Sequence, residues 1–451
     1  MYDLLIKGGK FPDFKTELMT EGNIGIENGK VTYIGIDQPE AKEVINAIGK
    51  VVSPGFIDIH MHEENFVQEG NKYIIAQMML EMGVTTAVGG NCGMQNQDLA
   101  KFKETIKAMG GSPINYIMLA GYNTFRYELN IGRYDEANSE QRRIIKDRLI
   151  RELNEGAFGI SFGIEYDPGI TYEEIIDAIN CIDDPKLLVA AHYREDCIKD
   201  ISSVKEMIKI AENIPFKFQI SHLSSCSAMG YMEESLKVIN EAMKSNPRLN
   251  YDTYPYNAFS THMGSAVFED GCLEGWKKDY DSILLTDEPY KDVRCTKEIF
   301  EKVRVEYPDM LAVAFVMNEE EIAAAIANQN GMVASDAIIT NGNGHPRAAG
   351  TFPRVLGKYV REDKVLPLID AIRKITKEPA DRLEMRNKGR IELGSDADIT
   401  IFNPDTIMDG ATFSDLHIKP IGIDYVIING AIAMHKNETI NNRLGGFISC
   451  K

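Results

Sequence analysis

The sequence predicts an α/β protein, a (β/α)8 TIM-like barrel carrying a small β-sandwich domain built from both chain ends. Through the middle of the 451-residue chain, short apolar runs alternate with helical patterns, which is typical of strand–helix units around a parallel sheet. Eight such apolar runs occur in series, as a closed barrel of this type requires. The two ends of the chain instead read as short strands and turns.

The predicted barrel strands are separated by stretches that fit amphipathic helices, such as 71–82, 139–154, 171–182, 201–213 and 232–243. A doubly wound open sheet is the structural alternative. We favour the barrel because no Gly-rich phosphate loop follows any of the strands. The eight strands are expected at 56–62, 85–89, 114–120, 158–164, 187–192, 216–222, 249–254 and 332–336.

The end segments are each too small to form a core alone. Residues 23–35 read as a hairpin with Asn28-Gly29 as its two-residue turn, and strand-like runs return at 397–402 and 425–433. We therefore expect residues 1–53 and 389–451 to combine into one β-domain, with the barrel at 54–388. The connection at about 265–330 is unusually long, which predicts a lid-like insertion over the active-site face.

Composition restricts the partners. The net charge is −19, from 49 Lys and Arg against 68 Asp and Glu, which disfavours nucleic acid and anionic membranes. No apolar run is long enough to cross a bilayer. The N-terminus does not resemble a signal peptide, and the seven cysteines form no CxxC pair, so we expect reduced thiols and a cytoplasmic protein. A small molecule is the expected partner, and homo-oligomerisation stays open.

Metal-ligand side chains stand at the carboxyl ends of five predicted strands, where barrel enzymes place their chemistry. Each of them alone would be an ordinary core or capping residue. Together they offer imidazole, thiolate and carboxylate groups, which suit zinc, and their convergence predicts a metal site. The six residues are His60, His62, Cys92, His192, His222 and Asp336.

Longer motifs add a resemblance. The segments 51–62, 90–93, 345–357 and 389–404 are similar to the amidohydrolase superfamily and, within it, to the N-acyl-D-amino-acid deacylases (D-aminoacylases). The resemblance implies a tight zinc site formed by Cys92, His192 and His222. His60, His62 and Asp336 would frame a second, weaker site, whose occupancy stays open. The fourth strand has no Lys to bridge two metals, and Glu165 is a candidate for a bridging carboxylate.

The resemblance also implies a reaction. Zinc lowers the pKa of bound water toward about 7, the water attacks an amide carbonyl, and Asp336 acts as the acid and base that moves its proton. Arg347 would bind the carboxylate of an N-acyl-D-amino acid through its guanidinium fork. Further substrate contacts are expected from Tyr166, Tyr256, Ser260 and Ser224.

Two departures keep alternatives open. Ser224 stands where the family carries a Lys, and Tyr122 where it tends to have a His. A cyclic-amide hydrolase resembling dihydroorotase or hydantoinase, or another amidohydrolase, is therefore the second hypothesis. A barrel that binds metal without activity is the third, although Asp336 argues against it, because a purely structural zinc needs neither an open position nor a base.

Overall fold

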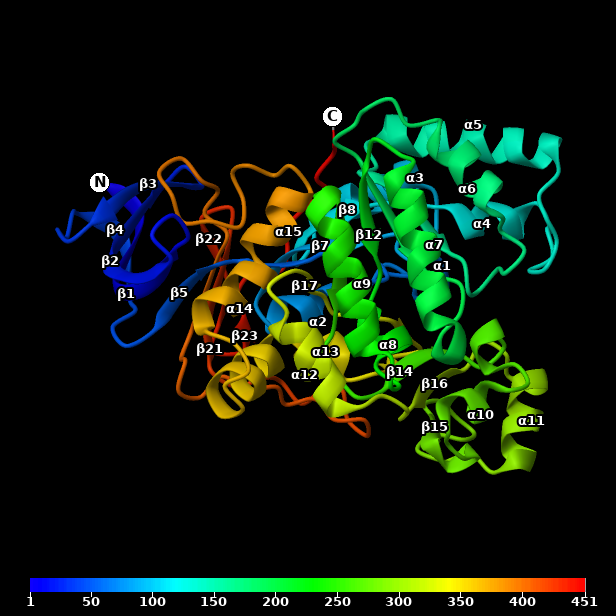
Figure 1. Cartoon of the computed structure of the whole chain (residues 1–451). Coiled ribbons are helices and arrows are strands. Elements are labelled where there is room, and N and C mark those ends of the chain that lie inside the picture. Colours follow the sequence, from blue (N-terminus) through cyan, green and yellow to red (C-terminus); the bar gives the residue numbers. More distant parts are fainter. Residues whose placement is uncertain (451) are drawn as a thin grey trace.

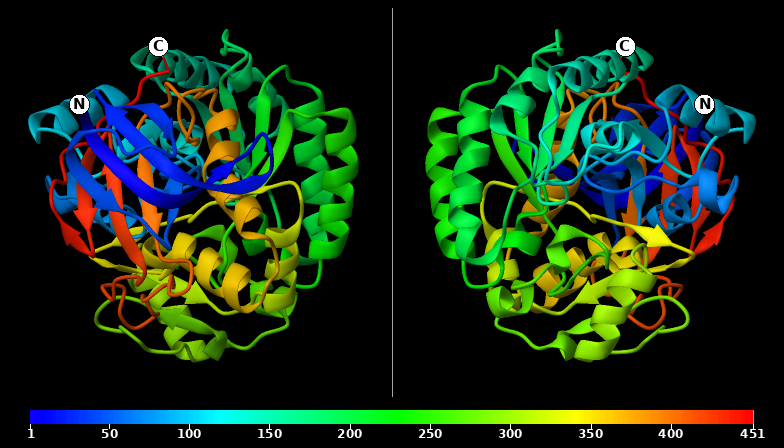
Figure 2. Two further views of the ribbon diagram at one scale, coloured as in Figure 1. Left: turned by 90° about the vertical axis from the view of Figure 1, so that its left-hand side faces the viewer. Right: turned by 90° about the vertical axis from the view of Figure 1, so that its right-hand side faces the viewer.

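The computed structural model describes residues 1–450, which fold into an α/β protein with two main sheet regions (Figure 1). One region gathers strands from both chain ends, and the other is a series of parallel strands from the middle of the chain. Figure 2 shows the N-terminal and C-terminal strands, in blue and red, lying side by side. Among the described residues, no helix is both long and apolar enough to cross a membrane.

The end strands form a nine-stranded sheet in the order β23-β22-β21-β20-β5-β1-β2-β3, with β4 pairing with β1. The predicted hairpin is confirmed, since β2 and β3 flank Asn28 and Gly29, which both take positive φ as this tight turn requires. The two-layer sandwich and the domain boundaries stay predictions. The strands are β1 (Tyr2–Asp13), β2 (Leu18–Glu27), β3 (Lys30–Gly35), β4 (Ala41–Asn46), β5 (Val51–Pro54), β20 (Ile399–Phe402), β21 (Ile423–Ile428), β22 (Ala431–His435) and β23 (Glu438–Thr439).

Each of the eight predicted inner strands is present, although several are shorter than expected. They form two parallel sheets, β6-β7-β8 and β17-β13-β12-β11-β10-β9. Only Leu119 separates β8 from β9 in the chain. Their bounds are β6 (Phe56–Asp58), β7 (Val84–Gly89), β8 (Asn115–Met118), β9 (Ala120–Gly121), β10 (Gly159–Gly163), β11 (Leu188–His192), β12 (Lys217–Ile220), β13 (Leu249–Thr253) and β17 (Met332–Val333).

The first and last of these strands continue into segments that meet. The Asp336 N–H donates to the His60 carbonyl and the His62 N–H to the Ala337 carbonyl, each over 2.8 Å. The segments that follow β6 and β17 are therefore neighbours, and both carry predicted site residues.

Helices fill the connections, as the predicted alternation requires. They are α1 (Phe66–Glu69), α2 (Ile75–Glu81), α3 (Leu99–Ala108), α4 (Tyr122–Glu128), α5 (Ser139–Glu155), α6 (Tyr172–Ile179), α7 (Asp200–Glu212), α8 (Leu223–Ser227), α9 (Met232–Ser245), α12 (Glu319–Ala327), α13 (Arg347–Arg354), α14 (Leu368–Ile375) and α15 (Lys377–Arg382), with a π-helix at Val355–Glu362. The helix α5 shows why these boundaries form. Asn138 and Gln141 make a reciprocal capping box at its start, and Gly156 ends it in a left-handed conformation.

The long connection between β13 and β17 contains its own three-stranded sheet, β14-β16-β15. It lies at one end of the molecule with two short helices (Figure 1). The last helix of the connection, α12, packs against α8 and α9 instead. The elements are β14 (Phe259–His262), α10 (Cys272–Trp276), β15 (Ile283–Leu285), α11 (Lys297–Glu306) and β16 (Leu311–Ala314). A lid function for this insertion stays a prediction.

Candidate metal centre and active site

Five strand ends bring the predicted ligands to one place. His192 is the last residue of β11, and the others follow within a few residues of β6, β7, β12 and β17. Four of them form a buried cluster whose ligand atoms lie within 4.8 Å of one another, namely His60, Cys92, His222 and Asp336. The Cys92 Sγ lies 3.3 Å from the Nε2 atoms of both His60 and His222. The Asp336 Oδ1 lies 3.5 Å from the His60 Nε2.

His62 stands at the edge of this cluster. Its Nε2 lies 3.4 Å from the Asp336 Oδ1, and its side chain is 15% exposed, against 1% for His60. The opening pair of histidines is therefore close to Asp336, as the sequence predicted. The role of both histidines as ligands of a second metal stays a prediction.

His192 belongs to a second cluster. Its Nε2 lies 2.5 Å from the Glu165 Oε2 and 3.8 Å from the Cys226 Sγ, and these three side chains form a separate potential ligand group. Cys92 also hydrogen-bonds with His192, as it does with His222, so the three residues of the predicted tight set lie together and their role as one zinc site stays a prediction. The clusters touch, since the His192 and His222 ring centroids are 4.4 Å apart.

The backbone is unusual at three ligands. Cys92, His222 and Asp336 have φ values of 52°, 32° and 50°, a left-handed conformation that costs non-glycine residues about 1–3 kcal/mol each. Each residue follows a strand end, so the turn aims its side chain across the strand ends. Such strain persists only where the surroundings enforce it.

Buried carboxylates provide part of that support. Asp252 accepts the His222 backbone N–H over 2.8 Å, and its Oδ1 lies 3.3 Å from the His60 Nδ1. Asp58 accepts the N–H groups of His60 and Ser335. A carboxylate behind a histidine ring orients it as a metal ligand, so Asp252 would hold His60 with its Nε2 facing Cys92.

The electrostatics suit a cation. Burial acts to lower the pKa of His62, but hydrogen bonds with Asp336 and Cys92 outweigh it and raise that pKa to about 9. Burial acts to raise the pKa of Asp336, but the Arg347 guanidinium, followed by His222, holds it well below its usual range. Burial also acts to raise the pKa of Cys92, but His60 and His222 lower it. Anionic ligands thus surround the histidines, and a metal ion would take the place of their protons.

Arg347 lies beside the cluster and is 1% exposed. Its Nη2 is 3.0 Å from the Asp336 Oδ2 and donates to the Ser260 carbonyl over 3.2 Å. Its guanidinium packs over the Tyr254 ring, 4.8 Å from the centroid. The remaining donors, Nε and Nη1, are buried without a hydrogen-bond partner, which is costly and would suit an anionic ligand.

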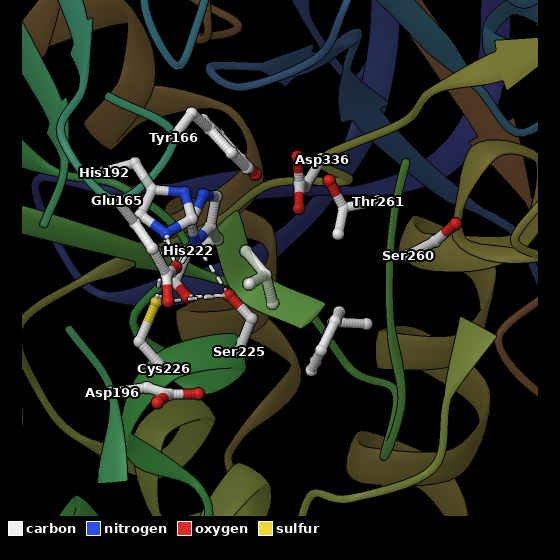
Figure 3. A pocket seen from close by; sticks show the side chains of 12 residues that line it. Glu165, Tyr166, His192, Asp196, His222, Ser225, Cys226, Ser260, Thr261 and Asp336 are labelled. Carbon is white, nitrogen blue, oxygen red and sulfur yellow. Dashed lines mark hydrogen bonds and ion pairs between the residues drawn. The ribbon is translucent and has the colours of Figure 1, made fainter. Parts of the chain in front are cut away.

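A pocket lined by His192, His222 and Asp336 opens beside these groups. Figure 3 shows His192, Glu165 and Cys226 on one side of it and Asp336 with Thr261 on the other. Tyr166 and Ser260, both predicted substrate contacts, line the cavity, and the Ser260 Oγ is buried without a partner. The insertion contributes Phe259 and Val267 to the apolar part of the wall.

Two predicted substrate contacts lie elsewhere. The Ser224 Oγ faces the backbone of Tyr254, and the cavity wall contains Ser225 in its place. The reason is local: His222 takes the left-handed conformation and α8 begins at once, so Ser225 turns back and its Oγ lies 2.7 Å from the His222 Nδ1. Tyr256 contacts Pro346 and Asp409 instead of the cavity.

Four polar wall residues are not predicted from the sequence, namely Asp196, Ser225, Cys226 and Thr261. Glu165 is predicted only as a possible bridging carboxylate. Cys226 carries the one signal that was available, because it lies four residues after a strand-end His and falls on the first turn of α8. Asp196 accepts a hydrogen bond from the only tryptophan, Trp276, a contact that no local pattern reveals.

The donor sets fit zinc, which takes imidazole, thiolate and carboxylate ligands. His60, Cys92, His222 and Asp336 supply all three kinds from within one buried group. In such a site the metal, when bound, polarises a carbonyl and activates water.

Comparison with known proteins agrees with this arrangement. Two models described as "Amidohydrolase family" match residues 51–246 and 321–434. The D-aminoacylase of Alcaligenes xylosoxydans xylosoxydans is 28% identical over 95% of this chain and 94% of its own, and the N-acyl-D-glutamate deacylase of that organism is 26% identical over 95% and 93%.

Solved structures of two such deacylases align with nearly the whole chain. A D-aminoacylase described as having a binuclear metal centre aligns with a TM-score of 0.90 at 26% identity, covering all of both chains. The N-acyl-D-glutamate deacylase of Bordetella bronchiseptica, solved with zinc and a phosphonate inhibitor, aligns with a TM-score of 0.88 at 25% identity, covering 99% of both chains. An L-hydantoinase from Arthrobacter aurescens, at 15% identity and a TM-score of 0.63 over all of both chains, shares the fold alone.

Proposed function

We propose that this chain, which belongs to the amidohydrolase family, is a zinc-dependent hydrolase that removes the acyl group from N-acyl-D-amino acids. Full-length relatives that act on such amides support the reaction class and the preference for D-amino acids. The serial order of the eight inner strands, the contact between the segments that follow β6 and β17, and the alignment with D-aminoacylase support a closed eight-stranded barrel at 54–388. The β-domain would comprise 1–53 and 389–451, and the insertion would act as a lid.

The observation that carries the proposal is Arg347. A buried guanidinium with two unpartnered donor nitrogens, Nε and Nη1, stands next to Asp336, and Asp336 belongs to the ligand cluster. An anionic group bound by Arg347 would therefore lie close to the metal cluster. An acylated amino acid fits this spacing, because its carboxylate and its amide bond are attached to the same carbon atom.

Each residue then has a defined task. Zinc, when bound among these ligands, supplies an activated water and polarises the amide carbonyl. Asp336, whose pKa is held low, accepts the proton of the water and delivers it to the leaving nitrogen. Arg347 pairs with the carboxylate through charge-assisted hydrogen bonds. Tyr166 and Ser260 hydrogen-bond polar groups of the substrate from the cavity wall.

The test is hydrolysis by the purified zinc protein. The panel contains N-acetyl-D-amino acids, their L-enantiomers, hydantoins and dihydropyrimidines, and amine release or ring opening is measured. We expect hydrolysis of at least one N-acetyl-D-amino acid with little turnover of its enantiomer. Turnover confined to the cyclic amides, or no turnover of any N-acetyl-D-amino acid, would overturn the assignment.

A further inference from the structure

A line of three buried polar side chains connects the helix α15 with the metal-ligand cluster. It begins at Arg382, the final residue of α15, passes through Gln219 of β12 and ends at Asp252 of β13. Each of these three residues is at most 7% exposed. Ala380 and Leu383, which lie close to Arg382 in the chain, pack into an apolar cluster of the inner strands, so α15 presents the arginine to the buried side of these strands.

The hydrogen bonds along this line have a fixed direction. The Arg382 Nε donates to the Gln219 Oε1 over 3.1 Å, and the Gln219 Nε2 donates to the Asp252 Oδ2 over 2.9 Å. A guanidinium can only donate hydrogen bonds, and a carboxylate can only accept them. The Gln219 amide can therefore satisfy both neighbours in one orientation only. A second bond, from the Arg382 Nη2 to the Phe218 carbonyl, holds the guanidinium in place.

The other oxygen of the Asp252 carboxylate faces the ligand cluster. The Asp252 Oδ1 accepts the His222 backbone N–H over 2.8 Å and lies 3.3 Å from the buried Nδ1 of His60. Because Gln219 occupies Oδ2, the carboxylate cannot rotate without losing a hydrogen bond. Oδ1 is thus kept facing two members of the cluster at once, through the ring of His60 and the left-handed backbone of His222.

The arginine also supplies a charge. Burial lowers the pKa of Arg382 to about 9, and the negative charge of Asp252 opposes that decrease, so the guanidinium stays protonated at neutral pH. Asp252 therefore has a positive charge on one side and two histidines on the other. An anionic carboxylate behind a ligand histidine fixes the orientation of the ring and raises its basicity.

A purely structural anchor accounts for less of the arrangement. Lys217 already has that role, since its Nζ donates to the Asp381 and Arg382 carbonyls over 3.1 and 2.9 Å and ties β12 to the end of α15. Anchoring the helix requires neither an arginine that reaches Gln219 nor a buried amide that contacts Asp252. Support of the ligand cluster accounts for both.

We propose that Arg382 and Gln219 are positioning residues for the metal centre, which hold the Asp252 carboxylate so that it orients His60 and His222 as metal ligands. This inference rests on the metal centre proposed above and not on the identity of the substrate. It predicts that two residues outside the cavity wall set the affinity for the metal.

The zinc affinity of the full-length protein tests the proposal without substrate. The dissociation constant is measured by competition with a chromophoric chelator, and the stability of the metal-free protein is measured by urea unfolding. Gln219→Met keeps a similar side-chain volume but breaks the line of hydrogen bonds. It should raise the dissociation constant for zinc by about 10–100-fold, the usual effect of removing a group that supports a metal ligand.

Lys217→Met is the matched control. It removes hydrogen bonds between the same strand and the same helix but none along the line to Asp252. Its dissociation constant should stay within about threefold of the parent, below the range expected for a group that supports a ligand. An equal loss of zinc affinity in Lys217→Met and Gln219→Met would overturn the proposal, because loosening of α15 would then explain both.

A double-mutant cycle with Asp252→Asn tests whether Gln219 acts through the carboxylate. If it does, Gln219→Met should add little to the loss of zinc affinity that Asp252→Asn causes. Losses that multiply independently would overturn the proposal, as would a parent-like dissociation constant in Gln219→Met. Should Gln219→Met fail to fold by circular dichroism, Gln219→Asn takes its place, because its shorter amide cannot reach both neighbours. Since zinc affinity is measured directly, failure to hydrolyse acyl-D-amino acids would leave this result unaffected.

Discussion

Asp336→Asn tests the central assignment most directly. The alternative Asp336→Ala would leave the buried Arg347 guanidinium without its 3.0 Å counter-charge, and unpairing a buried ion costs about 3–5 kcal/mol. Asparagine retains an oxygen that can accept from Arg347, so the fold is expected to survive. It cannot take up a proton from the attacking water.

The expected loss follows from that missing proton transfer. General acid–base catalysis contributes about 10²–10⁴-fold, which corresponds to about 3–5 kcal/mol of barrier at roughly 1.4 kcal/mol for each factor of ten. We therefore expect kcat on an N-acetyl-D-amino acid to fall by that factor. The KM and the zinc content should change far less, because His60, Cys92 and His222 remain in the cluster.

The assay measures kcat, KM, zinc content and melting temperature on the same preparation. Asp409→Asn is the control, since it neutralises another carboxylate paired with an arginine, Arg354 at 3.1 Å, outside the cavity wall. A zinc-loaded Asp336→Asn protein whose kcat is within about threefold of the parent would refute Asp336 as the acid and base. Loss of such a group should lower kcat far more than that.

Three further predictions address the carboxylate site, the metal and a buried charge. Arg347→Lys cannot fork onto a carboxylate, so KM should rise by about 10–100-fold, as a charge-assisted hydrogen bond contributes about 1.5–3 kcal/mol; an equal rise for the matching N-acetyl-D-amino acid amide, which lacks the carboxylate, would contradict this. A chelator should abolish hydrolysis and added Zn²⁺ should restore it; activity that persists in protein shown to be metal-free would exclude a zinc mechanism. Burial, opposed by Arg126, raises the pKa of Asp167 to about 6. The folded state therefore binds this proton more tightly than the unfolded state. The stability that the protonated Asp167 contributes is lost as pH rises from about 4 to about 6. Asp167→Asn removes this titration, and urea unfolding of parent and variant should show the parent losing roughly 3 kcal/mol relative to the variant over that range; parallel pH profiles would contradict it.

The strand positions could be predicted because each inner strand is a short apolar run, and its polar terminal residues follow from where the run stops. This is how His192 and Asp336 were placed correctly at one rim. The choice between Ser224 and Ser225 could not be predicted, because it depends on the left-handed turn at His222. Cys226 reaches the cavity only because α8 starts without an intervening loop.

Contacts between segments that are distant in the sequence could not be predicted either. Tyr256 follows β13 closely in the chain, yet it packs near Asp409 from the C-terminal region. The insertion's first strand, β14, begins at Phe259 and thereby supplies Ser260 and Thr261 to the wall. Local periodicity carries no information on such pairings.

The sheet that joins both chain ends has a consequence for biosynthesis. β5 pairs with β20, Ser53 opposite Thr400, and the Gly55 N–H donates to the Asp398 carbonyl. During translation, the edge of β5 that pairs with β20 therefore stays unpaired until nearly the whole chain has left the ribosome. Open strand edges invite pairing with other chains. Ribosome-bound chains that stop before β20 should consequently depend on chaperones, whereas the hairpin of β2 and β3, whose partners are adjacent in sequence, can form as soon as it emerges.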